Sequence, residues 1–319
     1  MAQVTVAPSA PASLPGGGTR IRSSASASRW DSWIRRLPLL PALIYVILVT
    51  QIPFVLTIIY SLQNWNLLKT EPVRFAGLQN YIDVISDPGT RNAIWNTIVL
   101  TIFAVALSVI LGVAIAMLLN RDIFGKGVVR TLMIGPFLVM PTAAALMWKD
   151  TLLNPLTGVV NYVLGPIGFS RTDWFSQFPM ATIVGIEVWR WTPFMMLIVL
   201  AGLQSQNQEV LEAAEVDGAR PFQLFRYITL PFIRPFIELG ALLGSLFVVQ
   251  SFDTIFMTTG GGPGTATTNL PYLLYLVAFQ GFDIGKASAI GVIAVILTMI
   301  VASFALRTLF TIFNVEVRR

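Results

Sequence analysis

The 319-residue sequence contains no cysteine and no histidine. Without cysteine the chain can form neither a disulfide nor a thiolate site, and without histidine it lacks the usual proton shuttle and metal ligand. Charged residues are also scarce, at 12% of the chain, whereas 55% of the residues are hydrophobic and the mean hydropathy is +0.72. These absences exclude most enzyme classes, and the composition is typical of an integral membrane protein.

The charged residues that are present do not form one patch. The net charge is +5 and the isoelectric point is near 9.7, but the basic residues are scattered at the ends of apolar runs. A nucleic-acid-binding protein would gather them on one face or along one helix. We therefore expect membrane lipid, and no nucleic acid, as a partner.

Six segments are long and apolar enough to cross a bilayer, whose hydrocarbon core of roughly 30 Å requires about 20 helical residues. Pro136, Pro141 and Pro193 interrupt the third and fourth segments, which favours kinked helices facing a bundle interior. Kinks that serve packing alone are an equal alternative. The sequence thus predicts an all-α membrane protein with six transmembrane helices, at 38–61, 95–119, 128–148, 180–203, 236–257 and 288–312.

Basic residues beside these segments predict the orientation in the membrane. Residues 1–30 are rich in Ala, Ser, Pro and Gly, which predicts a disordered cytoplasmic tail before a transmembrane domain over 31–319. Loops rich in Lys and Arg stay on the cytoplasmic side. The N and C termini and the 204–235 loop are therefore predicted to be cytoplasmic, from Arg35, Arg36, Arg121, Lys126, Arg130, Arg220, Arg226, Arg234, Arg318 and Arg319.

A polar segment, residues 212–235, separates two of the apolar runs. Ser205 and Gln208 have the spacing of a capping box, which predicts a helix start. Gly218 can close that helix in the left-handed conformation, and Pro221 suits the first turn of the next one. Pro231 should end this second helix. The pattern predicts two short helices joined by a tight bend.

The same segment resembles the EAA loop of ABC importer permeases, by the spacing of Glu212, Ala213, Ala214, Asp217, Gly218, Ala219, Ile228, Leu230 and Pro231. In that family the loop docks into a cleft of a cytoplasmic ATPase and couples ATP hydrolysis to transport. The resemblance implies that Glu212 is the polar anchor, Gly218 the bend, and Phe222 and Phe225 apolar plugs. The alternative is an amphipathic connector on the membrane surface.

Two further segments extend the resemblance to permeases for carbohydrates. Residues 75–81 (FAGLQNY) resemble the family's FxGLxNY segment, and Thr259, the run 260–263 (GGGP) and Thr267 resemble the loop of maltose-permease-F-like subunits. The likeness implies a six-helix type I importer permease fold in the bacterial cytoplasmic (inner) membrane. The partners it implies are a second permease subunit, two copies of an ATPase subunit and an extracytoplasmic substrate-binding protein. That protein would dock at Gly261, Gly262 and Pro263, in a glycine-rich stretch also expected to be a flexible surface loop.

No nucleotide site is predicted in this chain. Residues 281–288 (GFDIGKAS) have a passing likeness to a phosphate-binding loop, but the glycine spacing is one residue short and Ala287 replaces the required Ser or Thr. The resemblance therefore implies a subunit that binds no cofactor and is not an enzyme, with ATP and Mg²⁺ held by the partner ATPases. An ion-driven secondary transporter is the rival class, but it would show repeated discontinuous helices, and no convincing repeat is present.

Charged residues within spans usually face a cavity, so Glu187, Arg190 and Asp253 are candidates for function. Glu187 and Arg190 could also simply neutralise each other, and Trp191 could be an interfacial residue. Residues 137–142, 148–149, 173–175 and 268–272 resemble permeases for polyols such as sorbitol and mannitol, with other mono- or disaccharides or a glycerol-phosphate-type substrate as alternatives. The resemblance to sugar permeases, whose translocation site is lined at matching positions, implies that the substrate-binding residues are Glu187, Arg190, Trp191, Gly244, Val248 and Ser251, with Gln250 and Trp148 as further candidates.

Overall fold

The computed structural model describes residues 40–121, 124–169 and 171–316, with only the backbone described from 305 onward. The predicted tail over 1–30 and the terminal arginines lie outside these ranges. The chain divides into two compact units, Met1–Phe54 and Val55–Arg319. Helix α2 (Leu40–Ser61) begins in the first unit, and its last turns belong to the second. The following description concerns the second unit.

Within the described ranges, five helices are long and apolar enough to cross a membrane, and a bent pair makes a sixth candidate. Apart from α2, the long helices are α4 (Pro88–Leu119), α9 (Pro179–Gln204), α12 (Leu230–Val248) and α15 (Ile284–Glu316). The bent pair is formed by α5 (Lys126–Leu138) and by α6 (Pro141–Leu146) with η2 (Met147–Leu152). The six predicted segments are thus confirmed as apolar helices, with shifted ends.

Short elements connect these helices. A small hairpin of β1 and β2 pairs Gln63 with Phe75, and it is an exception to the predicted all-α content. The connecting elements are β1 (Gln63–Asn64), β2 (Arg74–Phe75), α3 (Gln79–Ser86), α7 (Val159–Leu164), η3 (Gly165–Ile167), α8 (Trp174–Gln177), α10 (Gln208–Val216), α11 (Pro221–Leu224), η4 (Phe225–Thr229), α13 (Asp253–Met257), α14 (Leu270–Tyr275) and η5 (Leu276–Gln280).

The third span is broken rather than gently kinked. The axes of the two halves differ by 97° across Val139 and Met140, and Pro141 begins the second half. A proline restricts the preceding residue to extended backbone, which accounts for the break at this position. Pro193, in contrast, lies inside α9, which is assigned as one helix from Pro179 to Gln204.

The fifth span ends earlier than the sequence predicted. We expected one segment over 236–257, but α12 stops at Val248 and a separate helix, α13, begins at Asp253. At the break, the Asn269 side-chain amide donates to the Ser251 carbonyl. This long-range bond satisfies a backbone group that the helix would otherwise pair, so the interruption is tolerated at depth.

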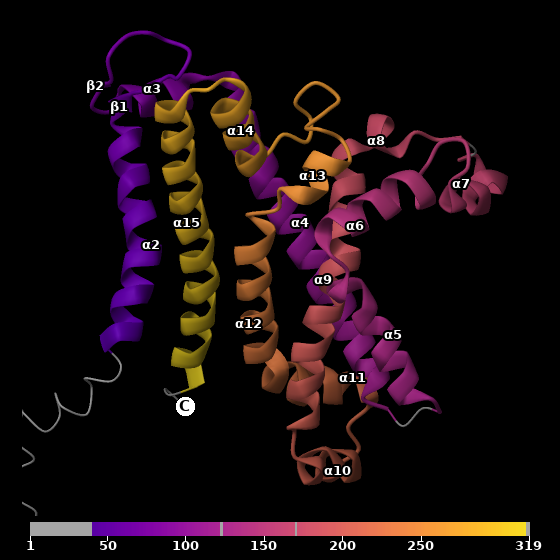
Figure 1. The fold of residues 1–319 in the computed structure, drawn as a ribbon. Helices are drawn as coiled ribbons and strands as arrows, with labels where there is room; N and C mark the ends of the chain where they lie inside the picture. Colours follow the sequence, from indigo (N-terminus) through magenta and orange to yellow (C-terminus); the bar gives the residue numbers. More distant parts are fainter. Residues whose placement is uncertain (1–39, 122–123, 170, 317–319) are drawn as a thin grey trace, which may run out of the picture. The chain divides into compact units, whose positions relative to one another are not determined.

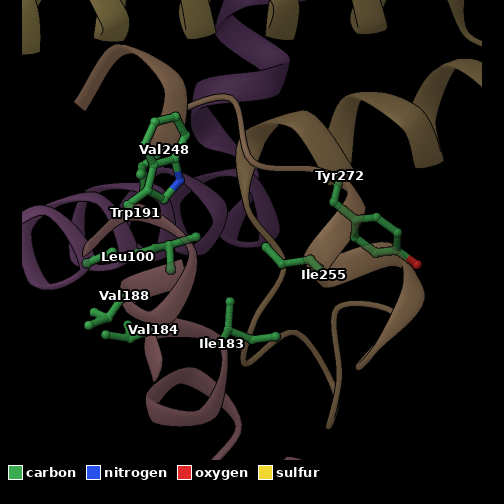
Figure 2. Close-up of a cluster of buried hydrophobic side chains, with 9 residues drawn as sticks. Leu100, Ile183, Val184, Val188, Trp191, Val248, Ile255 and Tyr272 are labelled. Carbon is green, nitrogen blue, oxygen red and sulfur yellow. The ribbon is translucent and has the colours of Figure 1, made fainter. Parts of the chain in front are cut away.

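Helices α4 and α9 form the centre of the unit, and α12 and α14 pack on them. Gly112 of α4 makes the closest approach, since a Cβ there would lie 2.6 Å from Met195 Cβ and 2.9 Å from the Met196 nitrogen on α9. Around this crossing, nine buried side chains form the cluster drawn in Figure 2, contributed by α4, α9, α12, α13 and α14: Leu100, Ala104, Ile183, Val184, Val188, Trp191, Val248, Ile255 and Tyr272.

The two ends of the second unit carry different loops. Figure 1 shows α10 at one end, beside the C-terminal end of α4 and the N-terminal end of α5. The loop between α13 and α14 lies at the opposite end, together with α8. The two loops predicted to meet different partners are therefore at opposite ends of the helices.

Candidate functional site

A cavity of about 210 Å³ lies where α9 faces the interruption of the fifth span and the start of α6. It brings together five of the eight predicted substrate residues: Glu187, Arg190, Trp191, Gln250 and Ser251. The remaining lining residues are Pro141, Phe247, Phe252, Asp253 and Thr254. Both broken spans therefore end at the same cavity, with α9 as its continuous wall.

The Glu187 carboxylate is fully buried, with 0% of the residue exposed. Its Oε1 accepts hydrogen bonds from the Ser251 hydroxyl at 2.7 Å and from the Thr254 hydroxyl at 2.5 Å. Its Oε2 accepts from the Trp191 indole at 3.2 Å and from Arg190 Nη1 at 3.1 Å. A buried carboxylate needs such partners to stay charged. Glu187 is thus a hub that joins α9 to Ser251 within the α12–α13 break and to Thr254 on α13.

Arg190 is only partly satisfied. Its Nη1 pairs with Glu187, which confirms the predicted neutralising pair, but its Nε is buried and has no hydrogen-bond partner among the described residues. An unpaired buried donor costs about 1–3 kcal/mol. The Arg190 side chain as a whole is 14% exposed and lines the cavity.

Trp191 is held in an aromatic cluster. Its ring stacks on Phe247 at 5.4 Å between centroids and meets Phe137 and Phe194 edge-on. The residue is buried, and its indole N–H is committed to Glu187. Trp191 therefore shapes one wall of the cavity rather than offering a free donor.

Three other predicted residues lie outside this lining. A Cβ at Gly244 would lie 2.3 Å from the end of Met195, so the glycine lets α12 approach α9, and Val248 is buried in the central cluster. Trp148 lines a separate apolar cavity of about 430 Å³ with Trp174 and Phe178, and its indole N–H is buried without a partner among the described residues.

Sequence reasoning missed Thr254 and Thr142. Thr254 donates to Glu187, and the Thr142 hydroxyl donates to Asp253 Oδ1 at 3.2 Å across the contact of α6 with α13. Asp253 was predicted within the fifth span, but it begins α13 at the edge of the cavity. The spacing of Ser251 and Thr254, two hydroxyls three residues apart next to an apolar run, was the available signal.

The predicted coupling segment forms two helices joined by a bend at Gly218, whose φ is +84°. The Gly218 and Ala219 nitrogens donate to the Glu215 and Ala214 carbonyls, which closes α10 in a Schellman motif. Pro221 begins α11, as predicted. The structure places Glu212, Ala213 and Ala214 on α10, Asp217, Gly218 and Ala219 in the bend, Phe222 on α11, Phe225 and Ile228 on η4, and Leu230 and Pro231 at the start of α12.

Two boundary predictions for this segment were wrong. Asn207, not Ser205, caps α10 by accepting from the Glu209 nitrogen at 2.9 Å, while Ser205 closes α9 by donating to the Gly202 carbonyl. Pro231 does not end a helix, because Pro221–Val248 runs on as one apolar helix. The π-helical turn η4 precedes Pro231 and changes the hydrogen-bond register there.

The segment is unusually exposed for its apolar content. Phe222 is 74% exposed and Val216 is 88% exposed, on either side of the Gly218 bend. Glu212 is exposed on the same short helix as Val216. An exposed apolar pair beside an acid is typical of a surface that meets another protein.

The glycine-rich loop at the opposite end is tied by several hydrogen bonds. The Thr267 hydroxyl donates to the Gly262 carbonyl at 3.0 Å, and the Asn96 amide donates to the Thr265 and Thr268 carbonyls. Gly261 has a φ of +81°, and a Cβ there would lie 2.5 Å from Thr268 Oγ1. The loop is therefore a rigid projection.

Among the described residues, no group of three or more acidic side chains gathers as a metal site would require. Beside the glycine-rich loop there is instead a polar cavity of about 410 Å³, lined by residues that include Lys149, Asp150, Asp173, Gly262 and Pro263. Lys149 donates to the Met257 carbonyl at 3.2 Å, which ties η2 to the end of α13.

The known proteins that this chain is similar to are components of membrane transport systems. Residues 92–319 match the family model described as "Binding-protein-dependent transport system inner membrane component". The probable ABC transporter permease protein y4oQ of Sinorhizobium fredii is 39% identical over 83% of this chain and 86% of its own length. The trehalose/maltose transport system permease protein MalF of Thermococcus litoralis is 33% identical over 85% and 90%.

A third relative, the sulfoquinovosyl glycerol transport system permease protein SmoG of Agrobacterium fabrum, is 32% identical over 89% of this chain and 94% of its own length. Among solved structures, a bacterial ABC transporter involved in the import of the acidic polysaccharide alginate superposes with a TM-score of 0.73, over 88% of this chain and 96% of that one. At 23% identity this likeness concerns the fold, which is that of a type I importer permease.

Proposed function

Because this chain belongs to the binding-protein-dependent transport system inner membrane components, the permeases of ABC importers, we propose that it forms the membrane path for a carbohydrate, with a sugar alcohol as the substrate that fits it best. The chain is a membrane subunit and not the ATPase. Hydrolysis of ATP, with its Mg²⁺, belongs to two copies of a separate cytoplasmic subunit, and a second permease subunit completes the path.

The observation that carries the proposal is the Arg190 guanidinium on the wall of a cavity that is otherwise lined by aromatic and polar side chains. The Arg190 side chain is 14% exposed, so a hydroxyl oxygen of a sugar or sugar alcohol can meet its exposed part, and the aromatic walls at Trp191 and Phe247 suit the C–H faces of such a ligand. The named substrates of two relatives, trehalose or maltose and sulfoquinovosyl glycerol, support a polyhydroxylated ligand.

About 210 Å³ of the cavity is formed by this chain, and the second permease subunit would add the rest of the path. The sequence likeness to sorbitol and mannitol permeases supports the alditol.

Coupling to ATP hydrolysis is assigned to residues 204–235. The exposed Phe222 and Val216 beside Glu212 offer an apolar plug and a polar anchor to a cleft on the ATPase. The covalent continuity of α11, η4 and α12 lets movement at this surface reach the cavity at the other end of α12.

The orientation follows from charge. Arg121, Lys126 and Arg220 lie in segments next to α10 at one end of the second unit, which the positive-inside rule assigns to the cytoplasm of a bacterial inner-membrane protein. The rigid loop with Gly261, Gly262 and Pro263 then faces outward, where a substrate-binding protein would dock. A projection fixed by hydrogen bonds costs little ordering entropy on binding.

Thermal shift of the cognate binding protein tests the substrate class. The protein would be titrated with sorbitol, mannitol, glucose, maltose and trehalose under identical conditions. The proposal expects the largest stabilisation with the alditols. A response to disaccharides with none to alditols would end the sugar-alcohol assignment, and no response to any carbohydrate would end the carbohydrate assignment itself.

A further inference from the structure

We infer that Asp253 sets the charge selectivity of this cavity, so that neutral polyhydroxylated ligands are admitted and carbohydrates carrying a carboxylate, sulfonate or phosphate are rejected. The inference rests on the proposed function, since it takes the cavity to bind a carbohydrate. It adds a residue whose role is to choose between ligands of equal size and different charge.

Three charged side chains line the cavity: Glu187, Arg190 and Asp253. The first two form an ion pair at 3.1 Å, and the Glu187 oxygens are further occupied by Ser251, Thr254 and Trp191. Their charges cancel within the wall of the cavity. One carboxylate, that of Asp253, therefore remains to set the net charge that a ligand meets.

Nothing in the described part of the chain cancels the charge of Asp253. Its one side-chain partner there is the neutral Thr142 hydroxyl, at 3.2 Å, and no lysine or arginine forms an ion pair with it. The nearby cation Lys149 lines the neighbouring polar cavity and donates to the Met257 carbonyl. The carboxylate is partly buried at the first position of α13, where the helix N-terminus favours an acidic side chain.

This arrangement treats neutral and anionic ligands differently. A hydroxyl group can donate to Asp253 while another meets the exposed part of the Arg190 side chain. An anionic group of the same size would face an uncompensated negative charge in a small, partly desolvated space, where like charges repel much more strongly than in water. Specificity against a competitor is commonly built from such a repulsive contact.

The purified complex of both permease subunits and the ATPase, in lipid nanodiscs and without the binding protein, allows a direct test. Binding of a neutral hexitol, sorbitol, and of an anionic six-carbon sugar acid, gluconate, would be titrated by ligand-observed NMR. For the wild type we expect sorbitol to bind at least about tenfold more tightly, a difference of about 1.4 kcal/mol. Asp253→Asn should bring this ratio close to one, because gluconate binding tightens once the negative charge is removed.

Asp150→Asn is the matched control, because it removes the same charge from an exposed residue at the neighbouring polar cavity. It should leave the ratio unchanged. If Asp253→Asn does not assemble, Asp253→Ser keeps a favourable helix-start residue without the charge, and the same ratio is expected. A wild-type preference for sorbitol that persists in the neutral variants would overturn the role of Asp253 and leave the proposed function standing. Failure of the wild type to bind either ligand would overturn both the role of Asp253 and the proposed function.

Discussion

The Arg190 guanidinium pairs with the Glu187 carboxylate at 3.1 Å, yet its Nε points a buried hydrogen at no partner in the described chain. The two members of this pair thus differ in how fully their polar atoms are hydrogen-bonded. Glu187 has donors on both oxygens, from Ser251, Thr254, Trp191 and Arg190 itself. We conclude that Glu187 organises the wall of the cavity, whereas Arg190 is the member able to meet a ligand.

Arg190→Lys should separate these roles. Lysine keeps a positive charge for Glu187 but lacks the planar guanidinium and its additional donors, so we expect the complex to assemble and uptake to fall by about tenfold or more, the size of a lost charge-assisted hydrogen bond. The measurement is the substrate concentration dependence of uptake in proteoliposomes. Wild-type uptake by this variant would remove Arg190 from the ligand's contacts.

Glu187→Ala should damage the fold. It leaves the guanidinium, an indole N–H and two hydroxyls without their acceptor in a buried site, and breaking a buried pair on one side costs about 3–5 kcal/mol. Lower yield and a lower melting temperature in detergent are expected. Glu187→Gln keeps one acceptor oxygen and should lie between this variant and the wild type.

The half-exposed pair of Asp83 with Lys286, at 3.1 Å, is the control for that experiment. Asp83→Asn should lower the melting temperature little, since exposed pairs contribute little to stability. Equal losses of melting temperature for Asp83→Asn and Glu187→Ala would contradict the role of Glu187 as a hub.

Phe222→Ala should uncouple the permease from its ATPase without unfolding it. The side chain is 74% exposed, so its removal costs the isolated subunit little, whereas loss of a central apolar anchor typically weakens an interface by about 2 kcal/mol or more. Co-purification of the ATPase and ATP-driven uptake should both fall.

Tyr227→Ala is its matched control, because Tyr227 is 73% exposed on the same continuous helix but five residues further along and on another face. It should retain the ATPase. Glu212→Ala should resemble Phe222→Ala in a weaker form. Full transport by both Phe222→Ala and Glu212→Ala would remove the coupling role from this segment.

Gly112→Ala should destabilise the crossing of α4 and α9. The new Cβ would lie 2.9 Å from the Met196 backbone nitrogen, which cannot move without shifting α9, and overpacking of this kind costs about 1–3 kcal/mol. Gly185→Ala adds the same methyl group to α9, where no heavy atom lies within 4 Å. A melting temperature lowered equally by both changes would show that helix geometry, and not the crossing, is responsible.

Much of the fold was predictable because hydropathy and local cap signals act over short distances. The six apolar segments, the Gly218 bend and the helix start at Pro221 all follow from neighbouring residues. The predicted N-cap of α10 was wrong because Asn207 and Ser205 are both residues that favour this position. Only the structure shows that Ser205 closes the preceding helix, which leaves Asn207 as the cap.

The site was harder to predict because long-range bonds shape it. At the break after Val248, Asn269 bonds the Ser251 carbonyl, and Thr254, on the helix beyond the break, bonds Glu187. Gly244 was assigned to the substrate path, yet small residues in membrane helices also serve close packing, as this glycine does against Met195.

The most direct test of the account is uptake of labelled sorbitol into proteoliposomes that hold the purified permease pair and ATPase, with ATP inside and the binding protein outside. We predict uptake that stops when ATP, the binding protein or the ATPase is omitted, and none by this chain alone under a proton or sodium gradient. Uptake by this chain alone under an ion gradient would contradict the account and identify a secondary transporter.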